Sequence, residues 1–266
     1  MKKVLSIAGS DCSGGAGIQA DLKTFSAHGV YGMSVIVSVV AENTSRVIEI
    51  QDITPDMIEK QMDAVFEDID VDAVKVGMLS QICSMEAVAG KLKQYVPQNI
   101  VVDPVMYAKN GCPLMKPEAI ETLIKVIFPL ADLITPNIPE AEKIVGIEIG
   151  GIEDMKKAAS IIHQMGCKNV IVKGGHSIGN AVDVLFDGDR FYQFDARRID
   201  TKNTHGTGCT YSSAITSNLA LGLSLPEAVD KAKEYVTTAI KHALPIGKGH
   251  GPTHHFYQLY KDGGLL

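Results

Sequence analysis

The chain is predicted to be an α/β protein with a mostly parallel central sheet covered by helices on both faces. Two features of the sequence support this fold class. Short runs rich in β-branched residues alternate almost throughout with longer runs of helical periodicity. Two of the short runs, residues 100–102 and 170–172, are wholly apolar, as strands buried on both faces usually are. No linker, repeat or change of composition divides the 266 residues, so we expect one domain over residues 1–266.

Strands are predicted where short apolar or alternating runs end in a polar or glycine-rich segment. In chain order they cover residues 4–8, 34–40, 47–50, 73–76, 100–102, 133–134 and 170–172. A hairpin follows, with strands at 182–186 and 190–194 that are joined by the turn Asp187-Gly188-Asp189.

Helices are predicted where apolar residues recur at three- and four-residue spacing. In residues 55–69, Thr54 is a candidate N-cap and Pro55 takes the first helical position, where a missing amide costs nothing. The other helices pass through Leu22 and Phe25, cover residues 81–95 and 117–128, start near Pro139, and cover 153–165, 207–221 and 225–243.

Charge and composition exclude several classes of protein. The formal net charge is −6 and the chain has no lysine or arginine run, which argues against a nucleic-acid surface. No apolar run approaches the ~18 residues of a membrane span, and the N-terminus reaches Gly9 too soon for a signal peptide. Five cysteines, an odd number without a C-x-x-C pair, suit reduced thiols. We expect a cytoplasmic protein that binds neither nucleic acid nor membrane.

Polar or glycine-rich clusters follow six of the predicted strands. They cover residues 9–11, 42–43, 77–78, 103–104, 135–137 and 173–176. Ligands of open α/β sheets bind beyond the carboxyl ends of the strands. One edge of the sheet is therefore expected to carry the chemistry.

The segment 203–210, Asn-Thr-His-Gly-Thr-Gly-Cys-Thr, opens a predicted helix and is the strongest candidate site. Gly206 and Gly208 leave space beside the backbone and permit positive φ. The amides of residues 206–209 would be unpaired donors at a helix N-terminus, where the dipole favours an anion. We expect a phosphate group in transfer to bind there. The alternative is an ordinary glycine-rich helix start with Thr204 or Thr207 as the N-cap.

Two other nucleotide-binding motifs were weighed. Gly15-x-Gly17-x-x-Ala20 matches a dinucleotide fingerprint, and Glu42 ends the next strand-like run. The glycines of that fingerprint follow the first strand directly, whereas residues 9–14 intervene here, so a nicotinamide enzyme is disfavoured. The chain has no Gly-x-x-x-x-Gly-Lys-[Ser/Thr], which excludes a P-loop NTPase.

Taken together, the motifs resemble those of a known family of kinases. They are residues 8–23 (Ala-Gly-Ser-Asp-x-Ser-Gly-Gly-Ala-Gly-Ile-Gln-Ala-Asp-Leu-Lys), Asp103-Pro104-Val105-Met106, Thr135-Pro136-Asn137-x-Pro139-Glu140, Lys173-Gly174-Gly175-His176, residues 203–210, and the closing Gly247-Lys248-Gly249-x-Gly251-Pro252-x-His254-His255-Phe256. The chain resembles the hydroxymethylpyrimidine/phosphomethylpyrimidine kinases of thiamine biosynthesis, in the ribokinase superfamily, from residue 4 to about 257.

The resemblance implies fold and reaction. The fold would be a ribokinase-like three-layer α/β/α structure with a central mostly parallel sheet of about eight strands. ATP with Mg²⁺ would phosphorylate 4-amino-5-hydroxymethyl-2-methylpyrimidine and then its monophosphate, and the protein would be a homodimer.

The resemblance also assigns the catalytic residues Gly206, Thr207, Gly208, Cys209 and Lys173. Cys209 stands where superfamily sugar kinases have an aspartate base, and a helix N-terminus favours the thiolate of a cysteine. Its alternative role is that of a small buried residue at a helix start. Lys173 is expected to reach phosphate, the alternative being a lysine that extends from the sheet edge to solvent.

The nucleotide and its metal would be held by a second set of residues. Asn137, Thr204, Lys173 and Lys248 are assigned to the nucleotide, and Asp103 and Glu140 to Mg²⁺, which keeps most of its waters. Taken alone, Glu140 would be a first-turn acid that the helix dipole favours, and Asp103 a loop cap.

Gly9, Asp21, Glu42 and Met78 match the positions of the pyrimidine pocket. Without the resemblance, Asp21 would lie on a solvated helix face and Met78 in the core. The family more often has Ala-Gln-Asn where this chain has Ala41-Glu42-Asn43. Glutamine both donates and accepts, whereas an ionised glutamate only accepts. Glu42 therefore needs a protonated ring nitrogen, a protonated carboxyl or a shifted substrate.

The C-terminal histidines His250, His254 and His255 lack cysteine or acidic partners at ligand spacing, so we expect them to fold over the nucleotide or contact solvent. Two alternative functions stay open. A pyridoxal or pyridoxamine kinase would share the phosphate-handling residues and differ around Asp21, Glu42 and Met78. A catalytically silent pyrimidine or vitamin sensor would not need the intact site loop.

Overall fold

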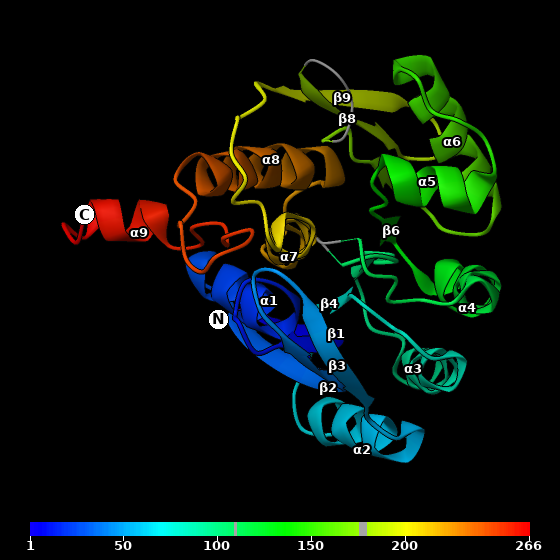
Figure 1. The fold of residues 1–266 in the computed structure, drawn as a ribbon. Helices are drawn as coiled ribbons and strands as arrows, with labels where there is room; N and C mark the ends of the chain where they lie inside the picture. Colours follow the sequence, from blue (N-terminus) through cyan, green and yellow to red (C-terminus); the bar gives the residue numbers. More distant parts are fainter. Residues whose placement is uncertain (109–110, 176–179) are drawn as a thin grey trace.

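A computed structural model describes residues 1–108, 111–175 and 180–266. The strands in these ranges form one nine-stranded sheet in the order β3-β2-β1-β4-β5-β6-β7-β8-β9, with helices on both faces (Figure 1). The predicted three-layer α/β/α architecture is confirmed, with one strand more than the eight or so expected.

The strands run as β1 Lys3–Asp11, β2 Tyr31–Glu42, β3 Val47–Asp52, β4 Ala73–Val76, β5 Ile100–Val102, β6 Leu133–Ile134, β7 Val170–Val172, β8 Ala181–Phe186 and β9 Phe191–Ala196. Neighbours from β2 through β7 pair in parallel. The pairs β2–β3, β7–β8 and β8–β9 are antiparallel, and β8–β9 is the predicted hairpin. The parallel strands therefore present their carboxyl ends at one edge.

The two helical layers bury opposite faces of this sheet. One layer holds α2 Pro55–Phe66, α3 Ile82–Tyr95, α4 Pro117–Thr122, α5 Ile138–Val145 and α6 Ile152–Gln164; the other holds α1 Gly17–Ala27, α7 Thr207–Ala220 and α8 Leu225–Lys241. Successive strand residues alternate between the layers. Val101 packs in the cluster with Tyr211 and Ile215 of α7, whereas Val102 joins the larger core beneath α2–α6.

Several elements differ from the sequence expectations. The predicted helix over 117–128 changes after α4 into a π-helical turn, η1 Leu123–Ile127, and a 3-10 turn, η2 Phe128–Leu130. Pro129 has no amide to donate, which favours the end of a helix there. Thr54 precedes α2 without a side-chain capping bond, although Pro55 does take the first turn.

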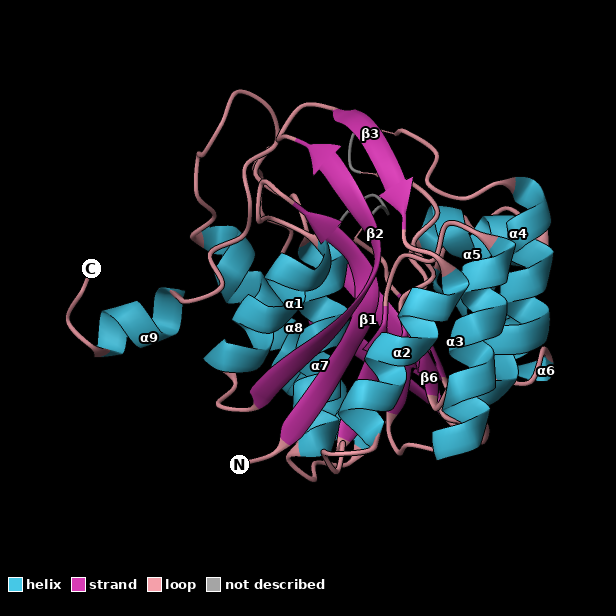
Figure 2. Ribbon diagram, turned by 90° about the horizontal axis from the view of Figure 1, so that it is seen from below, coloured by secondary structure: helices cyan, strands magenta, loops and turns pink. Residues whose placement is uncertain are grey.

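The chain ends in a short helix, α9 Tyr257–Asp262, that was not predicted and that projects from the body of the molecule (Figures 1 and 2). Cys12, Cys83, Cys167 and Cys209 form no disulfide. Within the described ranges, no helix combines the length and apolarity needed to cross a membrane.

Candidate active site

A cavity of about 810 Å³ opens at the carboxyl edge of the parallel strands. Most of the predicted site residues line it, and they come from both halves of the chain. These are Gly9, Glu42, Met78, Asp103, Asn137, Glu140, Lys173, Thr204, Gly206, Thr207, Gly208 and Cys209. The strand-end clusters and the glycine-rich segment thus share one cavity, as the sequence predicted. Asp21 and Lys248 do not line it, and His176 lies outside the described residues.

The start of α7 has the form expected for an anion site. Gly206 is the N-cap with φ 74°, and a Cβ on it would lie 1.7 Å from the Gly15 carbonyl oxygen, so only glycine fits. The hydroxyl of Thr207 donates to the Thr204 carbonyl, so neither threonine is the N-cap. The Thr207 amide also contacts that carbonyl at 3.3 Å, which leaves one donor fewer than predicted.

Gly208 faces the charged side of the cavity. A Cβ on this residue would lie 3.4 Å from Asp103 Oδ2 and 3.6 Å from Lys173 Nζ. A glycine here keeps open the space between the first turn of α7 and the Asp103–Lys173 ion pair.

The Asp103–Lys173 pair joins the ends of β5 and β7. Lys173 Nζ lies 2.7 Å from Asp103 Oδ1, which also accepts from Thr135 Oγ1 at 2.9 Å. Burial opposes the charge on Asp103, but Lys173 and then Lys75 outweigh it and hold the pKa of Asp103 below its usual range. Burial likewise opposes the charge on Lys173, and the Asp103 and Glu140 carboxyls raise its pKa. Lys173 is therefore not a solvated edge residue.

Asn137 and Glu140 form a reciprocal capping box at the start of α5. Asn137 Oδ1 accepts from the Glu140 amide at 2.9 Å, and Glu140 Oε2 accepts from the Asn137 amide at 2.8 Å. Glu140 is therefore also a first-turn acid of α5, which is its alternative, structural role. Burial raises the pKa of Glu140 to about 7; Lys173 opposes this rise and Asp103 adds to it. Two buried carboxyls thus share one lysine.

Cys209 sits in the first turn of α7 and lines the cavity. Burial raises the pKa of its thiol to about 11, with Lys75 opposing and with Asp21 and Asp103 adding to the rise. The expectation that the helix N-terminus favours the thiolate is therefore wrong for this structure. Desolvation and two carboxylates outweigh the helix dipole, which acts only over the first turn.

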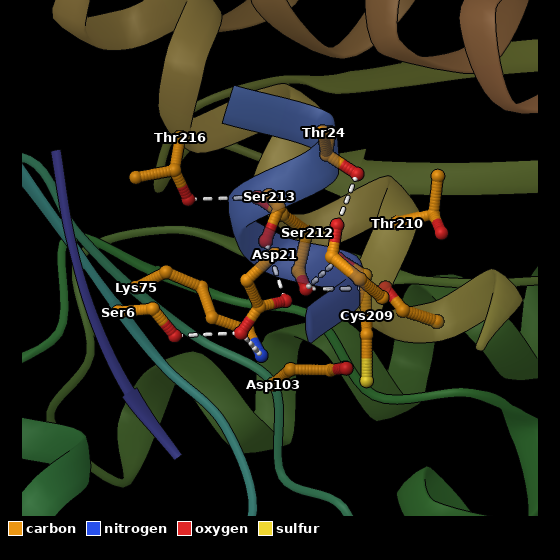
Figure 3. A network of polar contacts seen from close by, with 12 residues as sticks. Ser6, Asp21, Thr24, Lys75, Asp103, Cys209, Thr210, Ser212, Ser213 and Thr216 are labelled. Carbon is orange, nitrogen blue, oxygen red and sulfur yellow. Dashed lines mark hydrogen bonds and ion pairs between the residues drawn. The ribbon is translucent and has the colours of Figure 1, made fainter. Parts of the chain in front are cut away.

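Asp21 belongs to a buried network beneath the cavity (Figure 3). Its Oδ2 accepts from Ser6 Oγ at 2.6 Å and from Lys75 Nζ at 2.9 Å, and its Oδ1 accepts from Ser213 Oγ at 2.7 Å. The side chain is fully buried and lies neither on a solvated helix face nor at the cavity surface. The prediction that it contacts the substrate is not met here, because its oxygens already bind protein donors.

Lys75 is the residue of this network that the sequence analysis missed. It is fully buried in β4 and lines the cavity. It comes near Asp103, which follows β5, and near Cys209, in the first turn of α7 (Figure 3). Burial opposes its charge, but Asp21, Cys209 and Asp103 raise the pKa of the ammonium. A single lysine inside the run Ala-Val-Lys-Val was the available signal, because a charge in a central strand needs a buried partner.

Asp11 and His205 were also missed, and both lie beside Glu42. Asp11 Oδ2 accepts from His205 Nε2 at 2.9 Å and from the amides of Gly15 and Ala16, and Oδ1 accepts from the Ser13 amide. Burial opposes the charge on Asp11, yet these hydrogen bonds, that of His205 foremost, lower its pKa to about 2.

Glu42 ends β2, and its pKa shifts in the opposite direction to that of Asp11. Burial, and then the Asp11 carboxylate, raise the pKa of Glu42 to about 7, while His205 opposes the rise. One polar atom from each of Asp11, Glu42 and His205 lies within 4.8 Å of the others. His205 Nε2 donates to an ionised Asp11, so this nitrogen has no lone pair for a metal while that hydrogen bond is made.

Gly9 and Met78 pack against each other on the same side of the cavity. A Cβ on Gly9 would lie 2.6 Å from Met78 Cε and 2.7 Å from Ser38 Oγ, so the strand end needs a glycine. Met78 is largely buried, yet its side chain still lines the cavity.

The C-terminal motif does not cover the cavity as predicted. Lys248 is exposed. His255 is buried, with Nε2 3.1 Å from Thr210 Oγ1, and burial lowers its pKa to about 4. The amides of Gly249 and His250 instead donate to Thr44, in the turn between β2 and β3. The motif therefore fastens that turn to the region before α7.

Comparisons with known proteins agree with this geometry. The family model described as Phosphomethylpyrimidine kinase matches residues 11–254. The hydroxymethylpyrimidine/phosphomethylpyrimidine kinase of Rhizobium meliloti is 50% identical over 262 residues, which are 97% of this chain and 98% of that protein. The thiamine biosynthesis bifunctional protein ThiED of Geobacter sulfurreducens is 51% identical over 95% of this chain, which spans only 52% of that protein's length.

Two solved structures are also similar. An ADP complex of Bacillus subtilis pyridoxal kinase superposes with a TM-score of 0.91 at 42% identity, covering 97% of this chain and 99% of that one. A phosphomethylpyrimidine kinase from Clostridium difficile superposes with a TM-score of 0.81 at 52% identity, covering 91% of this chain and 100% of that one.

Proposed function

This chain belongs to the phosphomethylpyrimidine kinase family, and from that premise we propose that it phosphorylates 4-amino-5-hydroxymethyl-2-methylpyrimidine and then the monophosphate with ATP, in thiamine biosynthesis. The observation that carries the proposal is the shared cavity. The space beside Gly208 and the Asp103–Lys173 ion pair form the anion-binding part of the cavity. Gly9, Glu42 and Met78 line another part of it.

Lys173 and the first turn of α7 are proposed to hold the phosphoryl group in transfer. The ammonium of Lys173 supplies a fixed positive charge, and the glycines at 206 and 208 let a phosphate approach the backbone amides. Asn137 and Thr204 line the same cavity and are proposed to contact the nucleotide. Lys248 is not included, because its side chain is exposed and away from the cavity lining.

The residues around Asp103 fit a magnesium ion. Asp103 and Glu140 are both buried and share Lys173, and burial, followed by the Asp103 carboxyl, raises the pKa of Glu140. A divalent cation held partly through water would offset the cost of ionising Glu140 and polarise the phosphate oxygens. Asp103 and Glu140 would hold it, and the Asn137–Glu140 capping box keeps the Glu140 carboxyl directed to the cavity side.

Cys209 is proposed to relay the proton of the acceptor hydroxyl late in the first transfer: the sulfur accepts that proton as its own S–H proton passes to an oxygen of the transferred phosphoryl group. Phosphoryl transfer through a loose transition state needs little help from a base, so a thiol that stays protonated suffices for this relay. In the second transfer the attacking phosphate oxygen is already ionised near neutral pH, and no proton has to leave.

A pyridoxal kinase is the second candidate, because the solved structure of such an enzyme superposes along almost the whole chain. The curated pyrimidine kinase relative is more similar in sequence, at 50% against 42% identity, which favours the pyrimidine. A sensor without activity is disfavoured by the intact ion pair and glycines at the start of α7.

The test is ATP consumption by the purified protein with hydroxymethylpyrimidine, its monophosphate and pyridoxal in parallel. Turnover of both pyrimidines, with pyridoxal slower, is the expected result. A preference for pyridoxal would assign the enzyme to vitamin B6 salvage and leave the proposed phosphate site unchanged. Absence of turnover with all three compounds would favour the hypothesis of a non-catalytic sensor.

Location and assembly are part of the same proposal. Five cysteines, an odd number without a C-x-x-C pair, suit a reducing compartment such as the cytoplasm. Exposed apolar side chains on β2 and β3, Val39 and Ile48 among them, support a homodimer through that strand pair. Sedimentation equilibrium of the protein and of a Val39→Lys/Ile48→Lys variant tests this: the first should be dimeric and the second monomeric.

A further inference from the structure

The carboxyl of Glu42 faces the cavity without a protein partner. It lies at the end of β2, half-buried, and its side chain hydrogen-bonds to none of the residues that the structure describes. Its main-chain oxygen accepts from Cys12 Sγ at 3.0 Å. The side chain is therefore available to a ligand.

Charged and titratable groups surround this carboxyl from several elements. Asp11 ends β1 and Cys12 follows it, His205 precedes α7, Arg46 lies in the turn between β2 and β3, and Tyr107 follows β5. Asp11 is the decisive neighbour, because four hydrogen bonds keep it ionised. A second negative charge beside it is opposed by repulsion and by burial.

An ionised Glu42 is also the wrong partner for a neutral aminopyrimidine. The ring edge offers an amino donor next to a ring-nitrogen acceptor, whereas a carboxylate only accepts. One carboxylate oxygen would then face the lone pair of the ring nitrogen. A single added proton removes this conflict, because either O–H···N or O···H–N⁺ completes the second hydrogen bond.

We propose that Glu42 and the aminopyrimidine share one proton, so that binding of the acceptor takes up a proton at alkaline pH. The inference rests on the proposed function, since it requires an aminopyrimidine acceptor. In this arrangement Glu42 serves as a specificity residue: protonated, its carboxyl offers one donor and one acceptor, as a primary amide does.

The raised pKa of Glu42, about 7, sets the pH range of the effect. Below that value the free enzyme already holds the proton and binding takes up little. Above it, each pH unit should raise the KM for the pyrimidine about tenfold, because a smaller fraction of the enzyme carries the proton.

The experiment compares the wild type with Glu42→Gln, whose amide needs no proton. Calorimetric titration of hydroxymethylpyrimidine into each protein, in two buffers that differ in ionisation enthalpy, measures the protons taken up. At about pH 8 we expect close to one proton for the wild type and none for Glu42→Gln, and at about pH 6 little for either. The KM of Glu42→Gln should vary little over this range.

A His205→Gln variant is the matched control, because its amide can still donate to Asp11 and the imidazole is removed. The pH dependence should persist in it. Equal proton uptake by the wild type and Glu42→Gln, or none by the wild type, would overturn the proposal. Failure of the proposed function is distinct from this, because the pyrimidine would then not be phosphorylated at any pH.

Discussion

His205 Nε2 donates to Asp11 Oδ2 at 2.9 Å, across 194 residues of sequence. The bond joins the loop after β1 to the segment before α7, and a Cβ on Gly15, in that loop, would lie 2.3 Å from His205 Cδ2. The two loops that border the cavity are thus held together by one buried contact.

This contact should make stability depend on pH in acid. The pKa of Asp11 falls from 3.8 to about 2 on folding, so its contribution is present above pH 3.8 and is lost as pH falls toward 2. The shift corresponds to about 2 kcal/mol. Asp11→Asn should lower the free energy of unfolding by about that much at neutral pH, and the difference should shrink below pH 4. Urea unfolding at several pH values measures it; a constant difference would contradict the assignment.

Gly206 and Gly208 should respond differently to the same substitution. Gly206→Ala places a Cβ against the Gly15 carbonyl at positive φ and should destabilise the protein by about 3 kcal/mol. Gly208→Ala has helical backbone and should keep or slightly raise stability, by up to about 1 kcal/mol. Its methyl group enters the phosphate space, so kcat should fall about 100-fold, and Gly208→Val should be inactive. Near-full activity of Gly208→Val would contradict the anion site.

Glu140→Gln should stabilise the protein while impairing catalysis. The folded-state pKa of Glu140 is raised from 4.5 to about 7, so ionisation costs stability as pH rises through this range and the full cost applies above pH 7. Glutamine keeps the capping box and removes the charge. In EDTA at about pH 8, the free energy of unfolding should rise by about 3 kcal/mol.

The same Glu140→Gln variant should need more Mg²⁺ for half-maximal activity. Glu118→Gln is the matched control, because Glu118 is an exposed acid in the first turn of α4. This variant should change neither the free energy of unfolding nor the Mg²⁺ dependence. Unchanged Mg²⁺ dependence in Glu140→Gln would remove that residue from the metal site.

Cys209→Ala should slow the first phosphorylation about 100-fold and the second much less, because only the first releases a hydroxyl proton. Cys209→Ser, which keeps a group able to pass a proton, should lie between. Single-turnover rates with each acceptor give the comparison. Equal losses on both steps would show that Cys209 positions the substrate without handling the proton.

The thiol of Cys209 should also react slowly with iodoacetamide at neutral pH. Its pKa of about 11 implies a rate that rises about tenfold per pH unit from pH 7 to 10. Peptide-level mass spectrometry separates this site from the exposed Cys12 and Cys83. Rapid modification at pH 7 would indicate a thiolate.

Local sequence patterns were enough to predict the fold class, the sheet edge that carries the polar clusters, and the glycine-rich start of the helix at residues 203–210. These depend on local patterns: the spacing of apolar residues chooses helix or strand, and parallel strands bring their carboxyl ends to one edge. Glycine at 206 and 208 and lysine at 173 therefore predicted the charged side of the cavity without knowledge of the packing.

Which charged groups meet, and how deeply they are buried, depends on the tertiary structure. Lys75 and Asp21 are 54 residues apart, and their pairing removes Asp21 from the predicted pocket. Cys209 keeps its proton because desolvation outweighs the helix dipole, and burial, followed by the ionised Asp11, raises the pKa of Glu42. Protonation depends on burial and on neighbours distant in the chain, and neither quantity is a property of a local sequence pattern.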